Sequence, residues 1–223
     1  MTIAERALEM IRDGTVIGLG TGRAATAFVK ALGPAVRAGL RITGVPTSEV
    51  TAGLARELGI PLTTLDLAGE LDITFDGADE VAPNLNLIKG YGGALVREKI
   101  VAASSKRFVV LIGPEKEVSH LGEHGKLPVE VVPFALPLAR RKLELLGLPP
   151  VLRLNQDGTP YVTDNGNPIL DCKVGPIDDA AALEHAILYI PGVVGTGLFV
   201  DMAETVLIQN EDGTVSARHR VDA

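Results

Sequence analysis

Apolar and polar residues along the chain form two kinds of segment that follow one another in turn. Short apolar runs are typical of strands covered on both faces, and the segments between them carry apolar residues every three or four positions, as amphipathic helices do. Strands are predicted at 15–19, 41–45, 60–65, 71–75, 107–112 and 205–209. Helices are predicted at 4–11, 24–32, 49–58 and 94–103. This alternation predicts a mainly parallel, Rossmann-like α/β sheet with helices on both faces.

The order of elements changes from residue 127 onward. Strands are predicted at 129–132, 151–154, 169–174 and 193–198, helices at 134–146 and 178–188, and a hairpin partner at 161–163. Strand, helix, strand, strand, helix, strand is the ferredoxin-like order. We therefore predict a small inserted ferredoxin-like α+β domain at 127–198, with 1–126 and 199–223 forming the Rossmann-like catalytic domain. After the last strand we expect an Asp212-Gly213 turn and a polar tail.

Composition excludes several classes of protein. The 223 residues carry a net charge of −7, have no Trp and are 4% aromatic, so we expect no binding of nucleic acid. No apolar run approaches the length of a membrane span, and the N-terminal segment lacks the apolar core of a signal peptide. The single cysteine, Cys172, excludes an intrachain disulfide and suits the cytoplasm. The insert suggests a role in assembly, so we expect a homo-oligomer, either a dimer or a tetramer.

Two glycine-rich loops are candidate anion sites. Gly18-Leu19-Gly20-Thr21-Gly22 lies between a predicted strand and a predicted helix, where glycines let the backbone approach an anion and the helix offers free N–H groups. Its spacing matches neither the P-loop nor GxGxxG, and a tight turn without any ligand explains it equally well. The second loop, Lys89-Gly90-Tyr91-Gly92-Gly93, adds a lysine that can hold a phosphate or neutralise an oxyanion.

Acidic residues accompany both loops. Asp76-Gly77-Ala78-Asp79-Glu80 follows a predicted strand, at the end of the sheet where α/β proteins bind ligands. These acids could bind Mg²⁺, act as bases or cap a helix. Glu98 follows the second loop on a predicted helix, where Arg97 to Lys99 could also form an ordinary solvated face. Together the loops and acids indicate acid–base chemistry on a small anionic substrate. A metal site built on His120 and His124 is disfavoured, because nearby glycines make a helix there doubtful.

In these motifs the sequence resembles the type A ribose-5-phosphate isomerase family. The resemblance covers essentially the whole chain and rests on GLGTG at 18–22, DGADE at 76–80, KGYGGA at 89–94, REK at 97–99 and LPVEVVPFA at 127–135. It implies an aldose–ketose isomerase that interconverts ribose 5-phosphate and ribulose 5-phosphate in the non-oxidative pentose phosphate pathway. It also implies that the reaction passes through a cis-enediolate and requires neither cofactor nor metal.

The resemblance assigns roles to individual residues. Glu98 matches the catalytic base, Asp76 and Asp79 match acids that handle ring opening and hydroxyl protons, and Lys89 matches the lysine beside the reacting oxygens. The matched substrate-binding positions are Thr21, Gly22, Arg23, Ala24, Asp76, Gly77, Ala78, Asp79, Lys89, Gly90, Tyr91, Gly92 and Lys116. The chain departs from the family pattern at Arg23-Ala24, where Ser-Thr is usual, and at Tyr91, where glycine is usual. These departures alter the groups that would contact the phosphate.

Two other functions fit parts of the pattern. A non-catalytic phosphosugar sensor would keep Lys89 and the glycine loops but would not need Glu98 with both aspartates. A CoA or acyl transferase would use a glutamate as its nucleophile. The joint presence of Glu98, Asp76 and Asp79 favours the isomerase.

Overall fold

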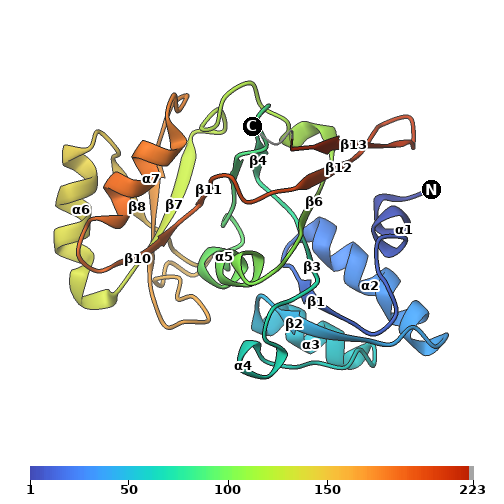
Figure 1. Ribbon diagram of the computed structural model, residues 1–223. Coiled ribbons are helices and arrows are strands. Elements are labelled where there is room, and N and C mark those ends of the chain that lie inside the picture. The colour runs from blue at the N-terminus through green and yellow to red at the C-terminus, as the bar shows by residue number, and fades with distance from the viewer. Residues whose placement is uncertain (221–223) are drawn as a thin grey trace. The chain divides into compact units, whose positions relative to one another are not determined.

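The computed structural model describes residues 1–220, which form two compact units (Figure 1). The first unit contains 1–78, 97–116 and the chain from 202 onward. The second contains 79–96 and 117–201. The second unit is thus larger than the insert expected at 127–198. The added segments form short strands whose two residues each are too few to show a periodic pattern in the sequence.

The first unit is built on a six-stranded sheet in the order β13-β12-β6-β3-β1-β2. Its strands are β1 (Thr15–Leu19), β2 (Ile42–Pro46), β3 (Ile73–Asp76), β6 (Phe108–Ile112), β12 (Thr205–Gln209) and β13 (Val215–His219). All neighbours are parallel except β12 and β13, which are antiparallel. The prediction of a mainly parallel sheet is therefore confirmed.

Helices cover both faces of this sheet, as predicted. The helical elements of the unit are α1 (Ile3–Leu8), α2 (Arg23–Arg37), α3 (Glu49–Glu57), α4 (Leu65–Ala68), residues 97–103 of α5 (Leu95–Ala103) and the 3₁₀ turn η1 (Pro114–Lys116). On one face Phe28 of α2 packs against Phe75 of β3, with ring centroids 4.6 Å apart. On the other face Val101 of α5 packs with Leu71 and Val45. Alternate residues of each strand point to opposite faces, so both sides of the sheet are buried.

Two local predictions in this unit are wrong. Residues 60–65 form no strand: only Leu62 bridges to Gly44, and α4 begins at Leu65. Pro61 has no N–H to donate, which favours a single bridge over a continuous ladder at this sheet edge. The second wrong prediction is the polar tail after the Asp212-Gly213 turn, because this segment contains the strand β13. The Asp212 carboxylate accepts hydrogen bonds from the backbone and hydroxyl of Thr214, and this turn leads the chain back along β12.

The second unit contains a four-stranded antiparallel sheet in the order β10-β7-β9-β8. Its elements are β7 (Lys126–Val131), η2 (Pro133–Ala135), α6 (Leu136–Leu145), β8 (Pro150–Leu152), β9 (Ile169–Lys173), α7 (Ala180–Leu188) and β10 (Val193–Thr196). This arrangement confirms the ferredoxin-like order. A second, three-stranded sheet in the order β11-β5-β4 joins β4 (Glu80–Val81), β5 (Leu87–Ile88) and β11 (Leu198–Phe199).

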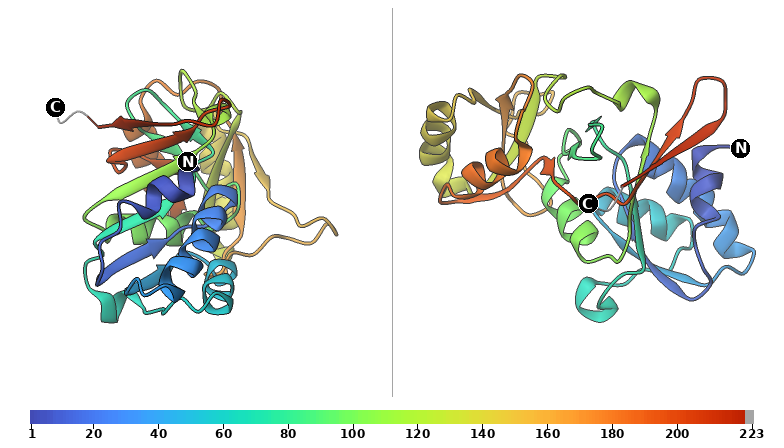
Figure 2. Two further views of the ribbon diagram at one scale, coloured as in Figure 1. Left: turned by 90° about the vertical axis from the view of Figure 1, so that its right-hand side faces the viewer. Right: turned by 45° about the horizontal axis from the view of Figure 1, so that its top comes forward.

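A long arm, residues 153–168, leaves the four-stranded sheet between β8 and β9 (Figure 2). The prediction of a hairpin partner at 161–163 is wrong, because these residues form no strand. The arm contains only two isolated bridges, Leu154 with Pro160 and Val162 with Pro168. The prolines lack the N–H groups that a continuous ladder needs. Within residues 1–220, no helix is long and apolar enough to cross a membrane.

Candidate active site

The first unit places two of the predicted loops at the switch point of its sheet. The chain leaves β1 for β2 on one side and later returns to β3 on the other side of β1. In such sheets ligands bind beyond the carboxyl ends of the strands at this point. The loop after β1 contains Gly20 to Gly22, and β3 ends at Asp76. Sequence positions far apart are therefore brought together by strand order.

Asp76 is fully buried at the end of β3 and contacts the first glycine loop. Its Oδ1 accepts hydrogen bonds from the backbone N–H of Thr21, at 3.0 Å, and of Gly77, at 2.7 Å. A Cβ atom at Gly20 would lie 2.2 Å from that oxygen and 2.5 Å from the Asp76 Cα. The close approach of these two loops therefore requires glycine at position 20.

The hydroxyl of Thr21 belongs to a cluster that sequence reasoning missed. Thr21 Oγ1 lies 2.7 Å from Thr47 Oγ1, 2.8 Å from Ser48 Oγ and 3.2 Å from Thr51 Oγ1. Thr51 Oγ1 also donates to the Gly20 carbonyl at 2.9 Å. The available signal was Ser48, a recognisable N-cap for α3 that accepts from the Thr51 N–H. The cluster thus connects the glycine loop to the first turn of α3 by hydrogen bonds.

The N-terminus of α2 follows this loop and has no side-chain cap. Gly22 is its N-cap, with a φ of 102° that favours glycine. The first bond into the helix is from Thr26 N to Gly22 O, and no hydrogen bond within residues 1–220 is made by the N–H groups of Arg23, Ala24 or Ala25. Such N–H groups, at the positive end of the helix dipole, suit an anion.

Arg23 and Lys116 supply positive charge near the same edge of the sheet. The Arg23 side chain is 88% exposed, and its Nη2 lies 2.9 Å from Oε1 of Glu115. Lys116 ends η1, the turn that follows β6. Because β6 is parallel to β3, the chain after it emerges at the edge that carries Asp76. An exposed ion pair of this kind contributes little to stability. Arg23 can therefore leave Glu115 and bind an anion instead.

Glu98 lies in the first turn of α5 and is 4% exposed. A carboxylate there interacts favourably with the helix dipole. A helix also holds its side chains more rigidly than a loop does, which suits a group that must be placed against a reacting atom. Glu98 is therefore a buried acid on a rigid element.

The second unit carries Asp79 and the lysine–glycine loop, and it brings them together. Oδ2 of Asp79 accepts from the N–H of Tyr91 at 2.9 Å. Lys89 is 2% exposed, its N–H donates to the Gly197 carbonyl at 2.8 Å, and its Nζ lies 5.5 Å from the centre of the Phe199 ring. The loop closes through a bond from Gly93 N to Gly90 O at 3.0 Å. Gly90 and Gly93 both have a positive φ.

Tyr91, where the family usually has glycine, has its side chain held within the second unit. Its hydroxyl donates to the Lys126 carbonyl at 3.1 Å, and Lys126 Nζ lies 4.1 Å from the centre of its ring. Burial, together with the carboxylates of Glu80, Asp79 and Asp171, raises the pKa of Tyr91 well above its usual value. The phenol is therefore neutral at any physiological pH.

Glu80, the third acid of the cluster, has a structural role. It is fully buried and accepts hydrogen bonds from the N–H groups of Gly122, at 2.5 Å, and His124, at 2.8 Å. The three acids of 76–80 thus have three separate sets of partners. Among residues 1–220, no group of three or more His, Cys, Asp or Glu side chains is arranged to hold a metal ion.

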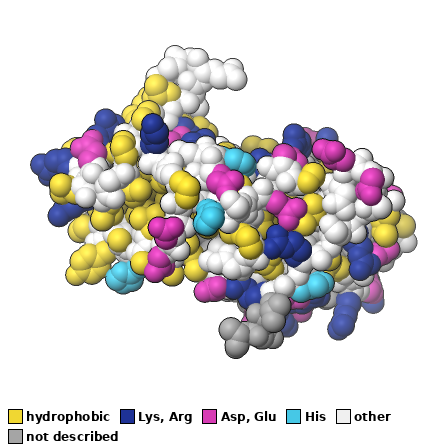
Figure 3. All heavy atoms as spheres, turned by 90° about the horizontal axis from the view of Figure 1, so that it is seen from above, with side chains coloured by type: hydrophobic (Ala, Val, Ile, Leu, Met, Phe, Trp, Pro, Cys, Tyr) yellow, Lys and Arg dark blue, Asp and Glu magenta, His cyan; other side chains and the backbone are white. Residues whose placement is uncertain are grey.

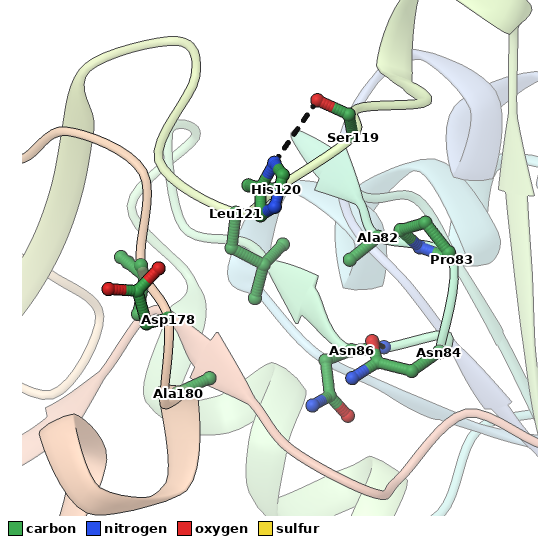
Figure 4. Close-up of a pocket in the computed structure, with 10 residues that line it drawn as sticks. Ala82, Pro83, Asn84, Asn86, Ser119, His120, Leu121, Asp178 and Ala180 are labelled. Atoms are coloured by element: carbon green, nitrogen blue, oxygen red, sulfur yellow. Dashed lines mark hydrogen bonds between the residues drawn. The ribbon is translucent and has the colours of Figure 1, made fainter.

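A pocket of about 230 Å³ in the second unit lies apart from these residues (Figure 4). Its lining is Ala82, Pro83, Asn84, Asn86, Ser119, His120, Leu121, Ile177, Asp178 and Ala180. None of the predicted site residues is among them, and neither lysine nor arginine is present. A phosphate would find neither lysine nor arginine there, so we do not assign the substrate to this pocket.

A mainly parallel α/β sheet with a glycine loop and a buried acid beyond the carboxyl ends of its strands is typical of an enzyme that acts on a small anionic substrate. Comparison with known proteins identifies the particular family. Residues 43–213 match the family model for ribose 5-phosphate isomerase A (phosphoriboisomerase A). The chain belongs to the ribose 5-phosphate isomerase A family.

Relatives and solved structures agree with this assignment. The chain is 56% identical to ribose-5-phosphate isomerase A of Roseiflexus sp. (strain RS-1) over 214 residues, which is 95% of this chain and 92% of the relative. The corresponding protein of Gloeobacter violaceus is 53% identical over 95% and 92% of the two chains. Ribose 5-phosphate isomerase A from Methanocaldococcus jannaschii matches with a TM-score of 0.93 and 43% identity, covering 98% and 96%. A D-ribose-5-phosphate isomerase in complex with phospho-erythronic acid matches with a TM-score of 0.94 and 41% identity, covering 97% and 96%.

Proposed function

We propose that the protein interconverts D-ribose 5-phosphate and D-ribulose 5-phosphate through a cis-enediolate, in the non-oxidative branch of the pentose phosphate pathway. The observation that carries the proposal is the burial of Asp76, Lys89 and Glu98, which are 0%, 2% and 4% exposed. Burying ionisable side chains costs solvation energy, and such groups are typical of catalytic sites. They are also the residues that match the family motifs.

The reaction consists of proton transfers. Glu98 removes the proton from C2 of the open-chain aldose, and the electrons of that C–H bond form the C1–C2 double bond as the aldehyde electrons move onto O1. Glu98 then returns the proton to C1 while the proton of O2 passes to O1, so that O2 becomes the ketone oxygen and O1 becomes a hydroxyl. Asp76 and Asp79 handle ring opening and the hydroxyl protons. Lys89 and loop N–H groups stabilise the negative charge of the enediolate. No electrons leave the sugar, so the chemistry requires no redox cofactor, and Lys89 with the loop N–H groups supplies the positive charge and hydrogen bonds that the enediolate oxygens need.

The substrate's phosphate is assigned to the loop after β1. The N–H groups of residues 23–25 and the hydroxyl-supported turn at Thr21 and Gly22 suit a phosphate, and Arg23 and Lys116 add charge. Arg23 replaces the hydroxyl groups that the family usually has at this point, and its planar guanidinium can bind two phosphate oxygens at once.

Arg23→Ala tests this assignment. We expect KM for ribose 5-phosphate to rise about three- to tenfold with kcat within about twofold, because a contact made equally in ground and transition states changes only binding. Steady-state kinetics of Arg23→Ala and of a control at the exposed Arg12, Arg12→Ala, provide the comparison. An unchanged KM in Arg23→Ala would show that Arg23 does not bind the phosphate.

A spectroscopic assay of ribose 5-phosphate conversion with a chelator present tests the function itself. We expect turnover that is insensitive to the chelator. Binding of the sugar phosphate without turnover would favour the phosphosugar sensor. A covalent adduct on Glu98, detected by mass spectrometry of the intact protein, would favour the acyl transferase.

We also propose that the protein is a homo-oligomer, a dimer or a tetramer, assembled through the second unit. Large apolar side chains are unusually exposed there: Phe134 is 97%, Tyr189 84%, Leu145 80% and Val151 67% exposed. Figure 3 shows hydrophobic side chains gathered on the surface of the unit that carries α6. Exposed apolar surface of this kind marks interaction sites.

Multi-angle light scattering, which measures molar mass in solution, tests the proposed oligomer. The wild type is expected at a multiple of the 23.4 kDa chain mass. Phe134→Asp combined with Tyr189→Asp should lower that mass toward the monomer, because buried unpaired carboxylates are costly at an interface. Leu67→Asp, at a residue of the first unit that is 78% exposed, is the control and should leave the mass unchanged. A monomeric wild type would overturn the proposal.

We further propose a cytoplasmic location. It is supported by the lack of any cysteine pair and by the burial of the one cysteine, which raises the pKa of Cys172 to about 12 and leaves an unreactive thiol.

A further inference from the structure

Arg153, at the start of the arm, forms a partly buried two-pronged ion pair with Asp171 of β9. Its side chain is 10% exposed and that of Asp171 is 19% exposed. Arg153 Nε donates to Asp171 Oδ2 at 2.9 Å, and Nη2 donates to Oδ1. Because β9 is hydrogen-bonded on both sides, to β7 and β8, the pair anchors the guanidinium to a rigid strand. None of the motifs recognised in the sequence includes these two residues.

The remaining nitrogen of Arg153 binds the lysine–glycine loop. Nη1 donates to the Gly90 carbonyl at 2.9 Å and to the Tyr91 carbonyl at 3.1 Å. One guanidinium therefore links a central strand to two successive peptide groups of the loop that carries Lys89. This use of several donors in one fixed plane is specific to arginine, and lysine cannot reproduce it.

The direction of these two carbonyls determines where the loop's N–H groups point. In a trans peptide the C=O and the following N–H lie in one plane and point in opposite directions. The N–H opposite the Gly90 carbonyl is that of Tyr91, and it donates to Asp79. The N–H opposite the Tyr91 carbonyl is that of Gly92, and it has no hydrogen-bond partner among residues 1–220. Arg153 thus holds the Gly92 N–H directed away from itself and available to a ligand oxygen.

Tyr161 of the arm holds the other end of the loop. Its hydroxyl donates to the Gly92 carbonyl at 3.3 Å, and a Cβ atom at Gly93 would lie 2.2 Å from that hydroxyl. Arg153 Cζ lies 5.8 Å from the centre of the Tyr161 ring, within the range of a cation–π contact. Three consecutive carbonyls of the loop, at 90, 91 and 92, therefore accept hydrogen bonds from the arm.

We propose that Arg153, held by Asp171, is a positioning residue for the isomerase reaction. It orients the peptide planes of residues 90–92 so that the Gly92 N–H, together with Lys89, meets the oxyanion of the enediolate. This inference rests on the proposed isomerase function. An N–H group that is already oriented needs no reorganisation as charge develops, which makes it effective in stabilising the transition state.

Three variants separate positioning from simple stabilisation of the fold. Arg153→Met removes the guanidinium and leaves Asp171 without its partner. Arg153→Met combined with Asp171→Leu replaces the whole pair by apolar side chains, an exchange that often preserves stability. Arg153→Lys keeps a charge near Asp171 but loses the fork. Arg141→Met, at an exposed arginine of α6, is the control.

We expect kcat of the double variant to fall about ten- to hundredfold while its melting temperature stays near that of the wild type, because small misplacements of catalytic groups have effects of this size. KM should change much less than kcat. Arg153→Lys should not restore kcat. Hydrogen exchange should be faster for peptides covering 89–93 than in the wild type and unchanged in α6.

Each other outcome overturns a specific claim. If the double variant keeps a kcat within about twofold of wild type, the pair does not position the loop. If kcat is restored wherever the melting temperature is restored, the pair is only structural. If the wild type itself does not isomerise ribose 5-phosphate, the proposed function fails, and that result is obtained before any variant is measured.

Discussion

Glu98→Gln is expected to lower kcat by about 10²- to 10⁴-fold, the contribution typical of a positioned base. Glutamine has nearly the same shape as glutamate but cannot accept the C2 proton, so KM should stay close to that of the wild type. The buried position of Glu98 in the first turn of α5 makes the exchange nearly isosteric. The loss should therefore come from chemistry and not from packing.

Solvent isotope exchange provides a second measure of the same step. In deuterium oxide the wild type should incorporate deuterium at the reacting carbons, and Glu98→Gln should lose exchange and turnover together. Glu57→Gln, at an exposed residue at the end of α3, is the matched control and should keep wild-type kinetics. A kcat for Glu98→Gln close to that of wild type would remove Glu98 from the role of base.

Lys89→Met is expected to lower kcat/KM by about 10²- to 10³-fold, mainly through kcat, which is the effect of losing one oxyanion-stabilising group. The charge of the ammonium opposes the charge that develops on O1 and O2 only as the enediolate forms. Methionine fills most of the space of the lysine, which is 2% exposed, so the loop keeps its packing. The backbone bond from Lys89 N to Gly197 O is unaffected by the substitution.

Steady-state kinetics and thermal unfolding distinguish the alternatives for Lys89. Lys142→Met, at an exposed lysine of α6, controls for the loss of one positive charge from the second unit. If Lys89→Met raises KM and leaves kcat unchanged, Lys89 binds substrate and transition state equally and does not stabilise the enediolate.

Much of the fold could be predicted because its signals are local. The run Phe108–Ile112 is apolar throughout, as expected of a strand covered by helices on both faces, and the structure buries all of it. The motifs were recognisable for a related reason. Gly20 directly follows β1 and Asp76 is the last residue of β3, and the carboxyl ends of parallel strands meet at one edge of a sheet.

Most of what the sequence did not predict depends on interactions that are distant in sequence. β4, β5 and β11 have two residues each, which is too short for any periodicity, and the sheet is completed when β11 pairs with β5 across more than a hundred residues. β13 is a local exception: its polar residues resemble a tail, but Val215 to His219 pair with the preceding strand, β12, at the sheet edge. The hydroxyl cluster around Thr21 joins loops that only strand order brings together.

The sequence by itself determined the alternation of elements, the ferredoxin-like insert and the residue types available for acid–base chemistry, since these follow from side-chain periodicity and local spacing. Tertiary structure alone decided what each acid does. Asp76, Asp79 and Glu80 are nearly adjacent in the chain, yet their partners are Thr21, Tyr91 and the Gly122–His124 turn. A buried carboxylate is hydrogen-bonded by the donors that packing places beside it. Because these donors are distant in sequence, the local sequence does not predict them. For the same reason, the hydrogen bonds from Arg153 to the lysine–glycine loop could not be predicted from the sequence and were found only in the structure.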